Sequence, residues 1–145
     1  MDRLHQVDRQ VGAFFRKWGI PALRVSLAVV FIWFGALKVL DVTPVTELVA
    51  NTVYWFDADW VVPALGVVEI IVGLGLLFQS AMRAVLGLFF LQMIGTFLVF
   101  VLQPDVAFQD GNPLLLTVEG EFVLKNLVLI AAGMVIAGTV ETEDN

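Results

Sequence analysis

The hydrophobic positions of the chain gather in four long runs, which are separated by segments rich in charged residues, glycine and proline. The runs cover residues 20–40, 61–78, 84–102 and 122–140. Each is about 18 to 21 residues long, and a helix needs about 20 residues to cross the roughly 30 Å hydrocarbon core of a bilayer. The pattern predicts an all-α membrane protein built as a bundle of four transmembrane helices. The first run is longer than the apolar part of a signal peptide, so we expect a retained anchor.

Shorter amphipathic segments accompany the runs. The N-terminal stretch carries apolar side chains at helical spacing between basic residues, which predicts an amphipathic helix in the headgroup region (Leu4, Val7, Val11, Phe14, Phe15 and Trp18). In the first outer loop, Thr43 as N-cap and Pro44 as first helical residue predict a second short helix. The second outer loop, residues 103–120, contains a turn sequence at Asp110–Pro113 and is expected to be irregular.

Composition supports the membrane assignment and gives one domain. Of the 145 residues, 59% are hydrophobic and 15% are charged, against roughly 45–50% and about 25% in soluble domains. So short a chain could not hide that much apolar surface from water. We therefore expect a single membrane domain over residues 1–145.

The charged residues are distributed unevenly and predict an orientation. Basic residues precede or open the first run or lie between the second and third (Arg3, Arg9, Arg16, Lys17, Arg24 and Arg83). The loops on the other side are acidic (Asp41, Glu47, Asp57, Asp59, Asp105, Asp110, Glu119 and Glu121). Because basic residues stay on the cytoplasmic side, both termini are expected in the cytoplasm of a prokaryotic cell, in a multi-pass plasma-membrane protein. Glu141, Glu143 and Asp144 then form a solvated acidic tail.

Several kinds of chemistry are excluded by the residue types. The chain has no cysteine and one histidine, His5. Thiolate catalysis, Cys-ligated iron–sulfur clusters, covalent haem and bis-histidine haem therefore lack their ligands. A redox centre of this system must lie on another subunit or be a diffusible molecule. We expect no covalent cofactor, no metal site and no nucleic-acid partner.

Glu69 is the most informative residue of the chain. It lies about eight residues, roughly 12 Å, into the second run and so near the middle of the bilayer. An ionised carboxyl group there is costly, which predicts that it is protonated, paired or facing a hydrated cavity. Gly66 and Gly73 share its helix face at the i, i+3, i+7 spacing, and small residues favour close helix packing. Glu69 is therefore expected to point into the bundle.

Two lysines are candidate partners for Glu69. Lys38 ends the first run, on one face with Gly35, and Lys125 lies one turn inside the fourth run. We favour Lys125, because it starts deeper. With Asn126, Gln92 and Ser26 these residues would line a polar pocket in the outer half of the bundle. The alternatives are that the lysines reach the outer headgroups, that Glu121 pairs with Lys125, that Glu69 is only an interhelical tie, and that the amides and Ser26 bond between helices.

Three stretches resemble the DoxX-like membrane proteins, near their YkgB-type branch. They run from Arg24 to Lys38, from Pro63 to Glu69 and from Thr117 to Asn126, and the similarity covers residues 23–138. It implies a four-helix membrane fold and a link to membrane redox systems, because the family is named after a subunit associated with thiosulfate or quinol oxidation at the quinone pool. Lys38, Glu69 and Lys125 match the family pattern. Asn126 stands where an Asp is common, which removes a negative charge.

These observations give three functional hypotheses. The first is a small accessory or quinone-interacting subunit of a membrane oxidoreductase, with quinone as ligand and redox-enzyme subunits as partners. The second is a proton-coupled small-molecule transporter that uses Glu69 and forms a homo-oligomer. The third is a membrane scaffold that catalyses nothing. The residues leave open whether the chain is an enzyme.

Overall fold

The computed structural model describes residues 1–143, and this part of the chain contains four helical segments long and apolar enough to cross a membrane. They are Asp2–Val39, Asp59–Phe78, Met82–Leu102 and Val118–Val140. The predicted helical membrane bundle is thus confirmed in its main features. Asp144, in the predicted acidic tail, lies outside the described residues. The elements are α1 (Asp2–Val39), α2 (Thr46–Thr52), α3 (Ala58–Phe78), α4 (Met82–Thr96), α5 (Leu98–Leu102), α6 (Pro104–Ala107), β1 (Phe108–Gln109), β2 (Asn112–Leu116), α7 (Val118–Leu124) and α8 (Asn126–Glu143).

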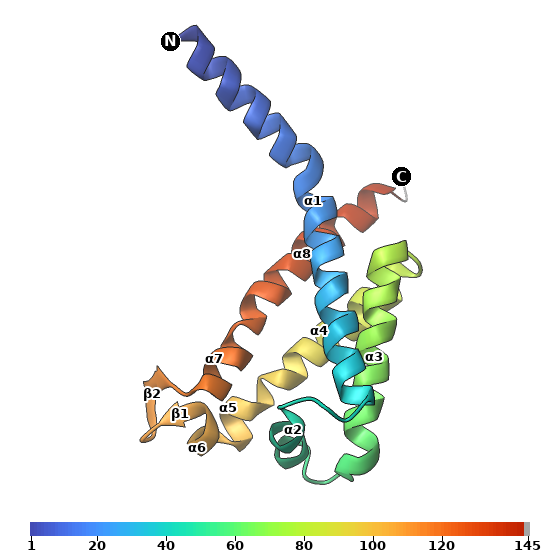
Figure 1. The fold of residues 1–145 in the computed structure, drawn as a ribbon, viewed down its shortest axis with the longest axis vertical. Coiled ribbons are helices and arrows are strands. Elements are labelled where there is room, and N and C mark those ends of the chain that lie inside the picture. The colour runs from blue at the N-terminus through green and yellow to red at the C-terminus, as the bar shows by residue number, and fades with distance from the viewer. Residues whose placement is uncertain (144–145) are drawn as a thin grey trace.

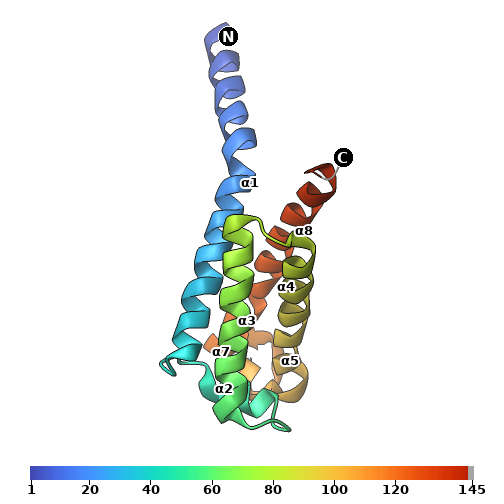
Figure 2. The ribbon, with the colours of Figure 1, turned by 90° about the vertical axis from the view of Figure 1, so that its right-hand side faces the viewer.

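The long helices pack in a ring, in which each contacts two of the others. α1 packs most extensively on α3, α3 contacts α4, α4 contacts α8, and α8 returns to α1. Figures 1 and 2 show the start of α1 and the end of α8 at one end of the bundle and α2 at the other. Figure 1 shows α6 and the β1–β2 hairpin at the same end as α2. Placing both ends on one side agrees with the predicted even number of crossings.

The interior is apolar, and so is much of the outer surface. The largest fully buried side chains are Phe89, Leu76, Ile136, Val62 and Val72. Large apolar side chains are also exposed around the bundle, among them Trp33 at 65%, Leu91 at 70% and Val128 at 71%. A helix bundle that is apolar inside and outside is typical of a lipid environment.

The sequence predicted a separate N-terminal amphipathic helix, but in the structure this segment is the first part of α1. α1 continues from Asp2 to Val39 with Pro21 inside it. Figure 1 shows that α1 changes direction along its length and that its first part projects beyond the bundle. A proline inside a helix removes one hydrogen bond and clashes with the preceding turn, so it can bend a helix without ending it. The contact of this segment with lipid headgroups stays a prediction.

The segment between the first and second crossings contains the expected short helix, with a later start. α2 begins at Thr46, and Val45 stands at its N-cap position. The Thr43 hydroxyl instead accepts a 3.4 Å hydrogen bond from the Val45 amide. Threonine side chains form such local turns in competition with helix capping. The predicted N-cap at Thr43 and helical start at Pro44 are therefore wrong by two residues.

The segment between the third and fourth crossings is ordered, which corrects the expectation of an irregular segment. Strands β1 and β2 form an antiparallel hairpin in which Gln109 pairs with Asn112. The two residues between them, Asp110 (φ 51°) and Gly111 (φ 70°), both have positive φ. Asp-Gly is a preferred dipeptide for this kind of tight hairpin turn. The turn sequence was recognised, but the short strands on either side of it were not.

The third and fourth crossings are each interrupted once. Phe97 separates α4 from α5, and Lys125 separates α7 from α8. The Phe97 amide bonds to the Ile94 carbonyl at 3.2 Å, three residues back, and Val128 bonds to Lys125 in the same way at 3.0 Å. These are tighter turns of the 3₁₀ type. The predicted helices 84–102 and 122–140 therefore exist as pairs of helices, Met82–Leu102 and Val118–Glu143.

Candidate functional site

Two glycines bring the backbones of α1 and α3 into contact. A Cβ atom added to Gly35 would lie 2.5 Å from the Gly66 carbonyl oxygen, and one added to Gly66 would lie 2.6 Å from the Gly35 carbonyl oxygen. Farther along, a Cβ on Gly73 would lie 2.8 Å from the Ala28 carbonyl oxygen. Only glycine permits this approach, so the small-residue face predicted for α3 is confirmed.

The same contacts fix how far apart Lys38 and Glu69 lie along the helices. Gly35 faces Gly66 and Ala28 faces Gly73 in an antiparallel arrangement. Glu69 then lies opposite Ile32, with Lys38 about 9 Å further along α1. Helical side chains lean toward the N-terminus of their own helix, so in antiparallel helices these two lean toward each other. The glycine register therefore brings a lysine and a glutamate together from different depths.

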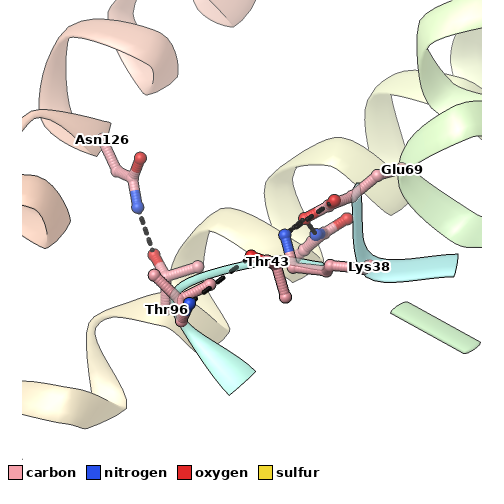
Figure 3. A network of polar contacts seen from close by, with 7 residues as sticks. Lys38, Thr43, Glu69, Thr96 and Asn126 are labelled. Carbon is pink, nitrogen blue, oxygen red and sulfur yellow. Dashed lines mark hydrogen bonds and ion pairs between the residues drawn. The ribbon is translucent and has the colours of Figure 1, made fainter. Parts of the chain in front are cut away.

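Lys38 and Glu69 form a buried ion pair. The Lys38 Nζ atom lies 2.8 Å from both carboxylate oxygens of Glu69, and the two residues expose 8% and 7% of their surface. Figure 3 shows the two side chains extending toward each other. Glu69 points into the bundle, as predicted. Its partner is Lys38, so the preference for Lys125 was wrong.

A third side chain joins the pair from α4. The Gln92 Nε2 atom donates a 2.5 Å hydrogen bond to Glu69 Oε1. Gln92 Oε1, the other end of the amide, is buried and has no hydrogen-bond partner. An unsatisfied buried acceptor forfeits its hydration without compensation. The Lys38–Glu69–Gln92 cluster therefore carries one acceptor that a further donor could satisfy.

Asn126 takes part in a different contact. Its Nδ2 atom donates to Thr96 Oγ1 at 2.9 Å, and that hydroxyl donates to the Met93 carbonyl at 2.6 Å. This bond joins α8 to α4 just beside the interruptions of both crossings (Figure 3). Asn126 is thus an interhelical hydrogen-bonder, the alternative given for it. The third polar candidate, Ser26, is exposed on α1.

Lys125 lies away from the cluster. Its side chain is exposed, and it lines an open hollow together with Glu121 and Leu124. In residues 1–143 it forms no ion pair with Glu69 or Glu121. Of the residues predicted to line one polar pocket, the structure therefore brings together Lys38, Glu69 and Gln92, and Lys125 lies apart from them.

Arg24 has a role that the sequence did not predict. Its Nη1 atom donates to the carbonyl oxygens of Leu76 at 2.7 Å and Leu77 at 3.0 Å. These are among the last carbonyls of α3, which have no partner inside the helix, and a cation there also complements the helix dipole. Two features of the sequence could have indicated this contact. Arg24 lies near the start of the first apolar run, and the second run, which is antiparallel to the first, ends at the same level.

Comparisons with known proteins give no family for the chain. No protein-family model, curated protein or solved structure matches it. Over residues 1–143, no group of three or more His, Cys, Asp or Glu residues lies close enough to hold a metal ion. The function is therefore argued from the cluster and its surroundings.

Proposed function

We propose that the chain is a small membrane subunit that binds a quinol or quinone at the Lys38–Glu69–Gln92 cluster and serves a membrane oxidoreductase. The observation that carries this proposal is the buried, unpartnered Oε1 atom of Gln92 beside the ion pair. It lies about halfway along the crossing Met82–Leu102, at a depth that a lipid-soluble ligand reaches from within the bilayer.

The hydrogen-bonding capacity of the cluster suits a quinol headgroup. A quinol hydroxyl donates a hydrogen bond, which Gln92 Oε1 lacks. An ammonium group has three donors, and Lys38 uses two of them on Glu69, so one remains for a ligand oxygen. One free acceptor and one free donor recognise a hydroxylated ring. Because the chain has no cysteine and one histidine, electron transfer is assigned to a partner subunit, and this chain binds the ligand and handles its protons. The DoxX-like resemblance points to the same quinone pool.

Quinone that co-purifies with the protein provides the test. The wild type, Gln92→Leu and Asn126→Leu are purified in mild detergent, and ubiquinone and menaquinone are extracted and quantified by mass spectrometry. Asn126 is a matched control, since it is also a buried amide but bonds to Thr96. We expect quinone with the wild type and with Asn126→Leu, and the detergent blank level with Gln92→Leu. Equal amounts in all three samples, or none with the wild type, would refute the proposal.

Proton-coupled transport is a second candidate, favoured by the position of a carboxylate near the middle of α3. A transporter must open the cluster to each side of the membrane in turn, whereas a quinol site need not. Val62 and Leu76 are buried on α3 at equal distances on either side of Glu69. If single cysteines at both positions react with a water-soluble thiol reagent in sealed vesicles, transport is favoured. Protection at both favours the quinol site.

We infer that the chain lies in a prokaryotic plasma membrane with both termini in the cytoplasm. The support is the concentration of basic residues before the first crossing and between the second and third. A cysteine at Asn112 should react with an impermeant thiol reagent on intact cells, and one at Ser80 should not. The chain has no cysteine of its own, so the labelling has no background. The reverse pattern would invert the orientation.

A further inference from the structure

An open apolar groove lies where the β2 strand meets the start of the fourth crossing. Its walls combine four aliphatic side chains, one carboxylate and one ammonium group (Leu116, Glu121, Leu124, Lys125, Leu127 and Val128). Leu127 and Val128 are more than half exposed. We name this hollow the Lys125 groove.

Lys125 is in an unfavourable place unless an anion accompanies it. It lies seven residues, about 10 Å, from the Val118 end of the crossing Val118–Val140, and its exposed side chain faces away from the bundle core. No carboxylate in the described part of the chain forms an ion pair with it. A lone ammonium group at this depth is costly in hydrocarbon, and its stem leans toward the N-terminal end of its helix, which is the nearer membrane surface.

We propose that the Lys125 groove binds one phospholipid with an anionic, hydroxyl-bearing headgroup. The lipid phosphate pairs with the Lys125 ammonium group, and one acyl chain lies along Leu124, Leu127 and Val128. Charge complementarity and the apolar walls both favour a lipid over a soluble anion, which has no chain to cover them.

Glu121 narrows the choice of headgroup. It lies one helical turn nearer the membrane surface than Lys125, on the same wall. A headgroup that extends outward from the phosphate therefore meets a carboxylate. Glycerol hydroxyls can donate hydrogen bonds to that carboxylate, whereas a second anionic group would be repelled. Phosphatidylglycerol fits this order of charges along the groove.

Native mass spectrometry of the delipidated protein tests the proposal. The protein is titrated with phosphatidylglycerol and with phosphatidylcholine of the same acyl chains, and bound lipid is counted for the wild type, Lys125→Gln, Lys125→Arg and Lys17→Gln. Lys17 is a matched control, because it is an exposed lysine whose ammonium group lies over the Trp18 ring. We expect one preferred phosphatidylglycerol, a loss of affinity of about fivefold in Lys125→Gln, and affinity near that of the wild type in the other two variants.

A further variant and three other results decide the outcome. Glu121→Gln should reduce the preference for phosphatidylglycerol over phosphatidic acid of the same chains. The proposal fails if Lys125→Gln binds phosphatidylglycerol like the wild type. It also fails if the wild type binds phosphatidylglycerol and phosphatidylcholine equally well. It also fails if lipid-free dimers dominate and disappear in Lys125→Gln, because the groove would then be covered by a second copy. None of these readouts involves quinone, so the result is independent of the proposed function.

Discussion

The α1–α3 interface and the α4–α8 interface solve the same packing problem in different ways. Between α1 and α3 the backbones touch at Gly35 and Gly66. Between α4 and α8, a glycine accommodates an aromatic ring, since a Cβ atom on Gly133 would clash with the Phe89 ring. Phe89 is fully buried. One interface is close and the other is filled by a large side chain.

The polar contacts at the two interfaces also differ. The close interface encloses a charged pair with long side chains, Lys38 and Glu69. The wider one holds a neutral hydrogen bond between short side chains, Asn126 and Thr96. Close backbones leave little room for lipid beside the ion pair, and charged groups inside a membrane face the bundle interior and pair with one another. The kind of polar group that a membrane helix can bury thus depends on how closely its neighbour packs.

The largest effect should come from separating the close interface. A leucine at Gly66 cannot fit beside the Gly35 carbonyl oxygen, so α1 must move away from α3. Overpacking alone costs about 1–3 kcal/mol, and the movement also parts Lys38 from Glu69. We expect Gly66→Leu to yield no folded protein, as judged by circular-dichroism melting and gel filtration in detergent.

A matched glycine controls that experiment. Gly87 on α4 has nothing within 4 Å of its Cβ position. Gly87→Ala should be neutral or stabilise the bundle by up to about 1 kcal/mol, because alanine favours helix. If Gly66→Leu melts like the wild type, the backbone contact does not hold the two helices together.

The next largest effect should follow from breaking the ion pair. Removing one partner of a buried pair typically costs about 3–5 kcal/mol, so Lys38→Met should lower the melting temperature strongly. Lys125→Met removes an exposed lysine that forms no ion pair in the described part of the chain, so it should not lower the melting temperature. The double variant Lys38→Met with Glu69→Met should recover most of the loss, because it leaves no orphaned charge. Equal melting of the two single lysine variants would contradict the pairing.

The two lysines also show what the sequence could predict about the site. The spacing placed Gly35 and Lys38 on one face of the first helix, and both are buried. The face of α3 around Glu69 was equally clear. Depth alone was a poor guide to the partner, because Lys125 lies at the interruption between α7 and α8. A one-residue break changes which way every later side chain points, and nothing in the apolar run marks it.

The fold was predictable where long-range apolar pattern decides it and less so where local turns decide it. Four crossings followed from run length alone. The start of α2 depended on whether Thr43 caps a helix or closes a turn, and the hairpin depended on five residues of β2 that carry no alternating pattern (Asn112–Leu116). The expected N-terminal helix is joined to the first crossing through Pro21, because a helix can bend at a proline without ending there.

A smaller effect should come from Arg24, which supports the far end of the close interface. Arg24→Gln removes the charge and the two bonds to the carbonyl oxygens of Leu76 and Leu77. We expect a loss of about 1–2 kcal/mol, the range for a cation at a helix C-terminus in a favourable position. Arg16→Gln, an exposed arginine on the same helix, should be neutral. The check is chemical unfolding of both variants in detergent, and equal unfolding would show that Arg24 does not support α3.

The smallest effect is expected at the wider interface, where the polar contact is neutral. Hydrogen bonds between membrane helices contribute about 0.6 kcal/mol on average and about 1.7 at most. A double-mutant cycle with Thr96→Val and Asn126→Leu isolates the bond between Asn126 Nδ2 and Thr96 Oγ1 from the packing changes that each substitution brings. We expect a coupling energy inside that range, well below the coupling of Lys38 with Glu69 measured in the same way. A coupling at Thr96 and Asn126 as large as that of the ion pair would mean that packing distance does not set the strength of the buried polar contact, and the contrast between the two interfaces would have to be explained by depth in the bilayer instead.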